Sequence, residues 1–358
     1  MSDRLLVATR KGLFDLRGDA AGGMAIAGRW FLGEPVSAVL RDPLDGAIYA
    51  ALDLGHFGAK LHRSDDDGAS WREVAVPSYA GLDGDPALAM MWVLEAGPAA
   101  PYGSGSIWAG TIPGGLFRSD DRGESWTLNR ALWDDPLRPQ WFGGGFDQPG
   151  LHSISFDPRD SNRLAVGVSC GGAWLSEDGG ETWAVSTEGM WAAYMPPAER
   201  ENPATQDPHR IVRCASAPDA LWTQHHNGVF RSVDGGRSWR EIAIAPSSFG
   251  FAVAVHPADP DTAWFVPAIG DQQRYPCDAR FLVTRTRDGG DTFESLTAGL
   301  PQGESYDLVY RHGLDVDGTG ERLAVGSTTG SLWVSDDGGD QWVGVSANLP
   351  PIHAVRWV

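Results

Sequence analysis

The sequence has few of the features that mark several large classes of protein. It contains 3 cysteines in 358 residues, and Cys170, Cys214 and Cys277 have neither metal-like nor disulfide-like spacing. It has no run of 18 apolar residues, so we expect no membrane-spanning helix. Residues 1–9 lead into a strand-like segment and have no signal-peptide core. Together these absences predict a cytoplasmic protein.

Basic residues are scarce compared with acidic ones. The chain has 28 lysines and arginines against 47 aspartates and glutamates, a formal net charge of −19. Nucleic acids and anionic membrane surfaces bind through cationic groups, so we expect neither as a partner. A small-molecule ligand, such as a carbohydrate, and a protein partner remain compatible with this charge.

Glycine, proline and tryptophan are abundant instead, and one octapeptide recurs six times. The counts of 46 Gly, 24 Pro and 16 Trp suit short strands joined by turns. The octapeptide has the pattern Ser/Thr-x-Asp-x-Gly-x-x-Trp/Phe, and its copies are spaced 49 to 57 residues apart. A nearly fixed period of this size predicts a repeat architecture. The central aspartates are Asp66, Asp121, Asp178, Asp234, Asp288 and Asp337.

Each octapeptide predicts a tight turn that closes a hairpin. The aspartate accepts hydrogen bonds from backbone N–H groups two or three residues later, and the glycine supplies a positive φ. The octapeptide resembles the Asp-box, or bacterial neuraminidase repeat, and the chain resembles the Asp-box β-propeller superfamily over essentially its whole length. This resemblance implies a propeller with the boxes at its periphery. It implies little about activity, because the superfamily includes sialidases, xyloglucanases, sorting receptors and photosystem assembly factors.

The repeats predict seven blades. Six blades end in octapeptides, and residues 4–30 supply three further strands that lack one. The segment 352–358 is a lone strand, which would complete that first blade and remove its open edge. We therefore predict an all-β fold, a seven-bladed β-propeller of four-stranded antiparallel blades, in a single domain spanning residues 1–358. The six other blades are expected at about 36–71, 92–126, 151–183, 210–239, 250–293 and 306–342.

The resemblance does not extend to a true sialidase. Sialidases of this superfamily have an Arg-Ile-Pro segment, an arginine triad, a Tyr–Glu nucleophile pair and an aspartic acid as proton donor. No Arg-Ile-Pro occurs here. Glu304, Tyr306 and Arg311 are close in sequence, but the other partners cannot be matched. Seven blades also differ from the six of sialidases, so sialidase activity is not expected.

Candidate site residues gather in the loops and turns that we expect on one face of the propeller, where long loops on a rigid scaffold carry function. Histidines are the clearest group. The predicted catalytic residues are His209, His226, Asp147 and His152. The predicted substrate-binding residues are Arg10, His56, Trp92, Arg210, His225, Arg274, Tyr306, Arg311 and His312. A divalent transition metal bound by His152, His209 and His226 is a further hypothesis, because neutral imidazoles suit such ions.

Each of these residues has a structural alternative. Asn227-Gly228 is a strong hairpin signal, so His225 and His226 could simply lead into a turn. His152 and His209 could satisfy buried backbone groups at the start of strands. Asp147 needs desolvation to act as an acid or base, and the neighbouring Gly143-Gly144-Gly145 favours a plain flexible loop.

Two hypotheses of function follow. The first is a hydrolase or lyase, glycosidase-like, that uses His/Asp proton transfer on a small polar, carbohydrate-derived molecule. The second is a non-catalytic propeller, similar to the assembly factors, that binds a protein or ligand. The convergence of titratable and aromatic groups on one face favours the first, since a flat docking surface does not need them.

Overall fold

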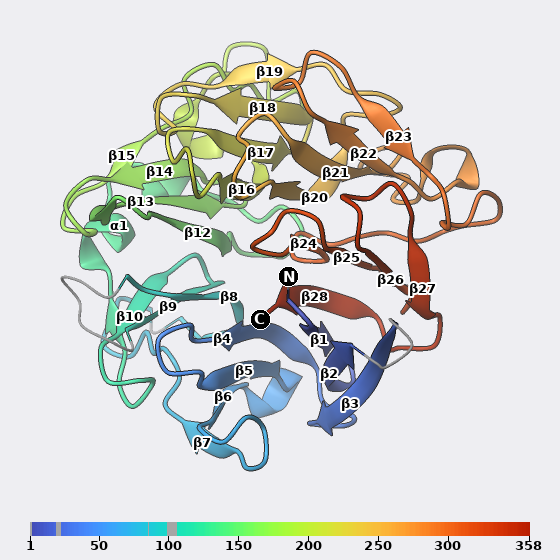
Figure 1. Cartoon of the computed structure of the whole chain (residues 1–358). Coiled ribbons are helices and arrows are strands. Elements are labelled where there is room, and N and C mark those ends of the chain that lie inside the picture. The colour runs from blue at the N-terminus through green and yellow to red at the C-terminus, as the bar shows by residue number, and fades with distance from the viewer. Residues whose placement is uncertain (1, 19–22, 85, 99–105) are drawn as a thin grey trace. The chain divides into compact units, whose positions relative to one another are not determined.

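The computed structural model describes residues 2–18, 23–84, 86–98 and 106–358. Its strands form seven four-stranded antiparallel sheets, which are labelled in Figure 1. The predicted all-β, seven-bladed propeller class is therefore confirmed. The one α-helix among the described residues, α1 (Arg130–Trp133), is a single turn. No helix in these ranges is long and apolar enough to cross a membrane.

Contacts between Cα atoms group the chain into two compact units. One unit is Met1–Gly33 with His209–Val358, and the other is Glu34–Pro208. We predicted a single domain, which stays a prediction.

The unit Glu34–Pro208 contains three of the sheets. Each strand of these sheets comes from a short run of alternating or continuous apolar residues. Pro, Gly and Asp residues at the ends of these runs keep the strands short. The strands are β4 (Val36–Arg41), β5 (Ile48–Asp53), β6 (Ala59–Ser64) and β7 (Arg72–Val74); β8 (Met90–Ala96), β9 (Ile107–Ile112), β10 (Leu116–Ser119) and β11 (Thr127–Leu128); and β12 (Leu151–Asp157), β13 (Asp160–Val168), β14 (Gly172–Ser176) and β15 (Ala184–Val185).

The unit that contains both termini holds the other four sheets. The strands are β16 (Pro208–Arg213), β17 (Leu221–His225), β18 (Gly228–Ser232) and β19 (Arg240–Ile242); β20 (Gly250–Val255), β21 (Ala263–Pro267), β22 (Val283–Thr286) and β23 (Glu294–Leu296); β24 (Leu314–Val316), β25 (Leu323–Gly326), β26 (Leu332–Ser335) and β27 (Val343–Ser346); and β28 (Ile352–Trp357), β1 (Arg4–Thr9), β2 (Gly12–Gly18) and β3 (Met24–Trp30).

The C-terminal strand completes the N-terminal blade, as predicted. The sheet order is β28-β1-β2-β3, and β28 runs antiparallel to β1 with Trp357 opposite Leu5. Figure 1 shows β28 lying beside β1. All six residues of β1 are buried, so this strand needs neighbours on both edges and cover on both faces.

One strand boundary differs from the prediction. The first strand of the last octapeptide blade was expected from residue 306, but β24 begins at Leu314. The Gly313 N–H donates to the Tyr310 carbonyl and closes a turn directly before the strand. Arg311 and His312 therefore lie in an irregular segment, where His312 forms an isolated parallel bridge with Ala354.

The octapeptides form the predicted turns. In the first copy, the Ser64 hydroxyl donates to Asp66 Oδ1 and accepts from Gly68 N, both at 2.8 Å. Asp66 Oδ1 also accepts from Ser70 N at 2.8 Å. The same three contacts recur in the copies that begin at Ser119, Ser176, Ser232, Thr286 and Ser335. Each turn links the third and fourth strands of its sheet.

These turns give a prediction about stability at low pH. The Thr292 hydroxyl and backbone N–H groups bond the Asp288 carboxylate and lower its pKa to about 2. A carboxylate whose pKa is lower in the folded protein than in the unfolded protein stabilises the fold at pH values above its unfolded pKa of about 3.9. This stabilisation is lost as the pH falls through the folded-state pKa. We expect the free energy of unfolding of an Asp288→Asn variant, measured with urea from pH 7 to pH 2, to fall less between about pH 4 and pH 2 than that of the parent protein.

Glu188→Gln, which changes an exposed glutamate outside the octapeptides, is the matched control. Its pH profile should follow that of the parent protein. Parallel profiles for the parent and Asp288→Asn would contradict the assigned role of the turn.

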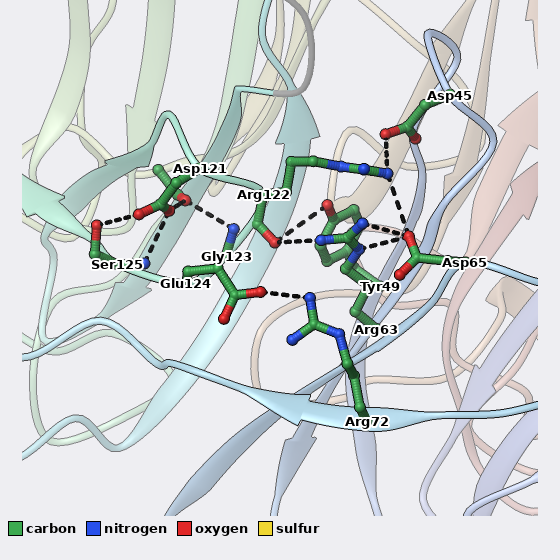
Figure 2. Close-up of polar contacts among 11 residues, drawn as sticks. Asp45, Tyr49, Arg63, Asp65, Arg72, Asp121, Arg122, Gly123, Glu124 and Ser125 are labelled. Carbon is green, nitrogen blue, oxygen red and sulfur yellow. Dashed lines mark hydrogen bonds and ion pairs between the residues drawn. The ribbon is translucent and has the colours of Figure 1, made fainter.

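The octapeptide turns also anchor neighbouring sheets to each other, which the sequence did not predict. Figure 2 shows the contact between the second and third blades. Arg63 Nη1 in β6 and the Tyr49 hydroxyl both donate to the Arg122 carbonyl in the next turn, at 3.3 and 3.4 Å. The Arg122 guanidinium in turn contacts Asp45 and, at 3.2 Å, Asp65. The preceding blade thus supplies the hydrogen-bond donors for the Arg122 carbonyl of this turn.

The other unit repeats this arrangement. Arg231 Nη1 donates to the Gly289 carbonyl at 3.2 Å, and Arg285 Nη1 donates to the Gly338 carbonyl at 2.8 Å. Arg63, Arg231 and Arg285 each directly precede the first residue of an octapeptide. This arginine position is the signal that the sequence offers for the contact, and it lies outside the octapeptide itself.

Candidate functional site

The three sheets of Glu34–Pro208 share an irregularity near the start of their first strands. In each sheet the pairing register between the first and second strands shifts there and skips one residue of the first strand. The skipped residues are Ser37 in β4, Trp92 in β8 and His152 in β12. Bulges of this kind change the direction of a side chain and are common next to active sites. Of the three, Trp92 and His152 were predicted site residues.

Trp92 and His152 contact each other. Their ring centroids are 5.6 Å apart in an edge-to-face arrangement, and His152 is completely buried. His152 Nδ1 also lies 2.9 Å from the Ser153 hydroxyl. The Phe146 ring meets Trp92 at 5.2 Å while 47% of Phe146 remains exposed. In this unit a row of contacting rings therefore runs from the buried His152 through Trp92 to the exposed Phe146.

Asp147 lies on the same loop as Phe146 and is exposed. The catalytic role predicted for it requires desolvation, which an exposed carboxylate does not have. Asp207 is one of the buried acids of this unit, with 3% of its surface exposed. Asp207 Oδ1 accepts from the Ser169 hydroxyl and from Cys170 N, both at 3.0 Å.

In the unit that contains the termini, His209 is held in one orientation. It is 2% exposed and stacks on Phe251 with centroids 4.5 Å apart and an interplanar angle of 19°. Its Nδ1 lies 2.6 Å from the Gly250 carbonyl. A carbonyl can only accept, so Nδ1 carries the proton and Nε2 carries the lone pair of the neutral ring. The structural alternative for His209, a bond to a buried backbone group, is thus present at Nδ1.

His226 lies beside His209. Their ring centroids are 5.5 Å apart, and Phe249 borders both at 5.7 and 5.9 Å. His226 occupies the β17–β18 turn together with Asn227, and Gly228 already belongs to β18. The expected Asn227-Gly228 turn is therefore wrong by one residue, because the ladder pairs His225 with Gly228. This shift puts His226 itself in the turn.

His225 has a different environment from His226. It is completely buried, and its ring meets Phe230 at 5.2 Å. Its Nδ1 accepts from Asn227 N at 3.4 Å. These contacts fit the structural alternative, in which His225 leads into the hairpin.

Two predicted arginines contact the ring on which His209 stacks. The guanidinium carbons of Arg274 and Arg311 lie 5.4 and 5.3 Å from the centroid of Phe251. Arg274 is partly exposed and pairs with Asp271, whereas Arg311 is buried. Cations at this distance from an aromatic face are attracted by its quadrupole.

The remaining predicted residues have other contacts or are exposed. Arg210 Nη1 donates to the carbonyls of Arg311 and Leu314 at 2.7 and 3.2 Å, which braces the start of β24. The exposed Tyr306 hydroxyl donates to Glu304 at 3.0 Å. Arg10 is exposed in the β1–β2 turn, and His56 is exposed next to Phe57 in the other unit.

The predicted metal ligands divide between the units, since His152 belongs to Glu34–Pro208 and the other two histidines do not. That set of three stays a prediction.

Comparison with known proteins places the chain among propellers. No family model matches it. It is 25% identical, over 282 residues, to an oligoxyloglucan-reducing end-specific xyloglucanase of Emericella nidulans, which is 70% of this chain and 32% of that protein. The chain thus spans about a third of the length of the curated relatives that it matches first.

Two solved structures illustrate the similarity of fold. The GH74 xyloglucanase from Xanthomonas campestris has a TM-score of 0.59 at 19% identity, covering 97% of this chain and 47% of that one. YCF48 bound to D1 peptide has a TM-score of 0.54 at 14% identity, covering 93% of this chain and 87% of that one. At these identities the likeness concerns the fold alone.

Proposed function

We propose that this chain is a cytoplasmic propeller hydrolase that acts on a carbohydrate or on a small polar molecule derived from one. The observation that carries the proposal is the 25% identity to a xyloglucanase over 70% of the chain. The activity of that longer relative is not transferred as such, because two thirds of its length have no counterpart here. What is proposed is the class of substrate and the hydrolytic reaction.

Exposed aromatic residues support a carbohydrate ligand. Sugar rings present C–H faces that stack on aromatic side chains, and such side chains are otherwise buried. Phe142 and Phe146 are exposed on the loop before β12 in one unit, and Tyr306 and Tyr310 are exposed before β24 in the other. Phe146 continues inward through Trp92 to His152.

The histidine pair supports proton transfer. His209 is oriented by the hydrogen bond from Nδ1 to the Gly250 carbonyl, and the other nitrogen of a neutral imidazole in this tautomer is the one that can accept a proton. His226 lies beside it in a turn and is only partly buried. A base oriented by a backbone carbonyl and placed next to a second titratable ring fits the predicted His/Asp chemistry better than the exposed Asp147 does.

The test is hydrolysis of xyloglucan oligosaccharides, cello-oligosaccharides and acidic oligosaccharides by the purified protein, with product analysis by anion-exchange chromatography. We expect a new reducing end from at least one substrate. His209→Gln should lower kcat/KM about 100-fold to 10,000-fold, as expected for loss of a general acid or base. A panel without any product would contradict the proposal.

A second variant separates binding from chemistry. Phe146→Ala should raise KM with little change in kcat, because it removes ring stacking that is equal in ground and transition states. Phe57→Ala, which removes another exposed phenylalanine of the same unit, is the control and should leave both parameters unchanged. An unchanged KM for Phe146→Ala would remove this loop from the substrate site.

A non-catalytic binding function is the second candidate. The support for this candidate is the share of each relative's length that matches this chain. The match to YCF48 includes 87% of that chain, whereas the match to the Emericella xyloglucanase includes 32% of that protein. YCF48 is seen with a D1 peptide. Under this candidate the chain would bind a peptide or protein and would hydrolyse none of the oligosaccharides.

A further inference from the structure

The long loop between β11 and β12 holds an arginine against two tryptophans. The guanidinium carbon of Arg138 lies 3.4 Å from the ring centroid of Trp133 and 5.8 Å from that of Trp141. All three residues belong to the unit Glu34–Pro208. A cation on an aromatic face is attracted by the ring quadrupole, so the two rings hold the guanidinium between them.

The rings that hold Arg138 are themselves packed in place. The Trp133 ring contacts the buried Tyr79, with ring centroids 4.8 Å apart. The buried Trp141 ring meets the Trp174 ring edge-to-face at 5.6 Å. The guanidinium therefore has a defined position before any ligand binds, which lowers the entropic cost of binding.

Arg138 lacks the carboxylate partner that other arginines of this unit have. Arg118 pairs with Asp120 at 2.9 Å, and Arg130 pairs with Asp134 at 2.7 Å. Among the residues that the structure describes, no carboxylate forms an ion pair with Arg138. Burial lowers the pKa of its guanidinium. A partly desolvated cation is unfavourable without a counter-charge, so an anion that reaches Arg138 stabilises it.

Two buried donors of this loop have no acceptor within the described part of the chain. They are Arg138 Nε and the indole Nε1 of Trp141. Buried N–H groups nearly always have an acceptor, and an exception in a native structure points to a bound water or ion. The loop is therefore rich in donors and positive charge and poor in acceptors, which an oxyanion would supply.

The shape of the site favours a carboxylate over a phosphate. The Trp133 ring is in van der Waals contact with the Arg138 guanidinium carbon, and Nε is buried, whereas Nη1 and Nη2 remain open to solvent. A ligand thus approaches along the N–H edge of the guanidinium, where a planar carboxylate accepts two parallel hydrogen bonds. One guanidinium also matches the single charge of a carboxylate better than the nearly double charge of a phosphate.

Exposed aromatic side chains lie next to the turn that carries this arginine. The 3-10 helix η2 (Arg138–Gln140) is joined to the following long loop by Asn202 Nδ2, which donates to Gln140 Oε1 at 3.0 Å. Phe142 meets Tyr194 of that loop with ring centroids 6.4 Å apart, and the two residues are 37% and 36% exposed. Sugar rings stack on side chains of this kind, so the surroundings suit a carboxylate attached to a sugar.

We propose that Arg138, held between Trp133 and Trp141, binds the carboxylate of an acidic saccharide such as a uronic acid. The saccharide part of this inference rests on the proposed function. Carboxylate binding itself is measured without any reaction.

The test is titration of the full-length protein, labelled with 15N-tryptophan, with sodium glucuronate at low ionic strength. The indole N–H signals report binding, and D-glucose and inorganic phosphate are the comparison ligands. We expect saturable shifts with glucuronate and weaker binding of the other two. Arg138→Gln should weaken glucuronate binding about 10-fold to 100-fold, the usual effect of losing hydrogen bonds to a charged group.

Two further variants make the result specific. Arg138→Lys keeps a cation but loses the planar fork, so it should weaken glucuronate binding by a smaller factor than Arg138→Gln. It also carries the test if Arg138→Gln fails to fold, which circular dichroism establishes. Arg200→Gln removes the same charge from an exposed arginine of this unit and should bind glucuronate like the parent protein.

Three outcomes would overturn the proposal: no saturable glucuronate binding, equal affinity in the parent and the Arg138 variants, or binding of glucose or phosphate as tight as that of glucuronate. Glucuronate binding without hydrolysis of any oligosaccharide would uphold this site and contradict the proposed hydrolase. Hydrolysis of a neutral oligosaccharide without glucuronate binding would do the reverse, so the two failures are distinguishable.

Discussion

Deletion of residues 352–358 is expected to abolish soluble folding. The deletion removes β28, which pairs with β1 along five register positions from Leu5 to Thr9. It also exposes the apolar neighbours of Ile352, Val355 and Trp357, all of which are buried. Burial of three such side chains contributes roughly 5–9 kcal/mol at about 1.5–3 kcal/mol each. That is comparable with the whole stability of a typical domain, about 5–15 kcal/mol.

The measurement is the soluble yield of the truncated protein and its thermal midpoint by circular dichroism. The control keeps the strand and changes its partly exposed side chains, His353→Ala with Arg356→Ala. This double variant should unfold close to the parent midpoint, because the ladder and the apolar face of β28 remain. A truncated protein that is soluble and has an unchanged midpoint would show that the N-terminal blade does not need its fourth strand.

Trp264→Ala is expected to cost about 3–5 kcal/mol of the free energy of unfolding. Trp264 in β21 is 1% exposed and belongs to a cluster with Val283, Leu296 and Trp342. Its indole Nε1 donates to the Gly338 carbonyl at 2.9 Å, in the octapeptide turn of the next sheet. The substitution therefore leaves a large cavity and removes a contact between two blades of the same unit.

Trp264→Phe separates the two contributions. It keeps most of the ring and removes the indole donor. The Gly338 carbonyl still accepts from Arg285 Nη1 at 2.8 Å, so no buried carbonyl is left without a partner. We expect a loss of about 0.5–1.5 kcal/mol, the usual contribution of one hydrogen bond. Urea unfolding of both variants is the measurement, and equal losses would show that ring volume does not dominate at this position.

The blades could be predicted because their signals are local. An octapeptide such as Ser64 to Trp71 contains every group that its turn needs, so each copy could be counted from the sequence alone. The seventh blade followed from two leftover segments that each lacked partners, 4–30 and 352–358. The first inference rests on hydrogen-bonding groups that lie within one short stretch of sequence. The second rests on strand segments whose missing neighbours can be recognised from the sequence.

Contacts between repeats could not be predicted in the same way. The bond from Arg63 to the Arg122 carbonyl joins residues from different repeats, and no pattern within one repeat specifies it. The start of the last blade was misplaced for a related reason, since the Gly313 turn delays β24 although residues 306–313 look strand-like in sequence.

The candidate site was predicted by residue type more than by geometry. His209 and His226 were both expected, and they are neighbours. The burial of Asp207 could not be predicted, because it depends on bonds from Ser169 and Cys170 in another loop. The exposure of Asp147 also depends on loop packing, which neither the sequence period nor residue composition determines.

The pairing of β28 with β1 has a consequence for synthesis on the ribosome. Strands β1 to β3 are made before β28, the strand that covers the open edge of β1. Translation of residues 31–351 at about 5–20 residues per second takes on the order of 15–65 s. For that time a strand with six buried positions in the finished protein lacks its neighbour. The sheet β28-β1-β2-β3 therefore stays incomplete during synthesis for longer than the six sheets whose four strands are consecutive in the chain.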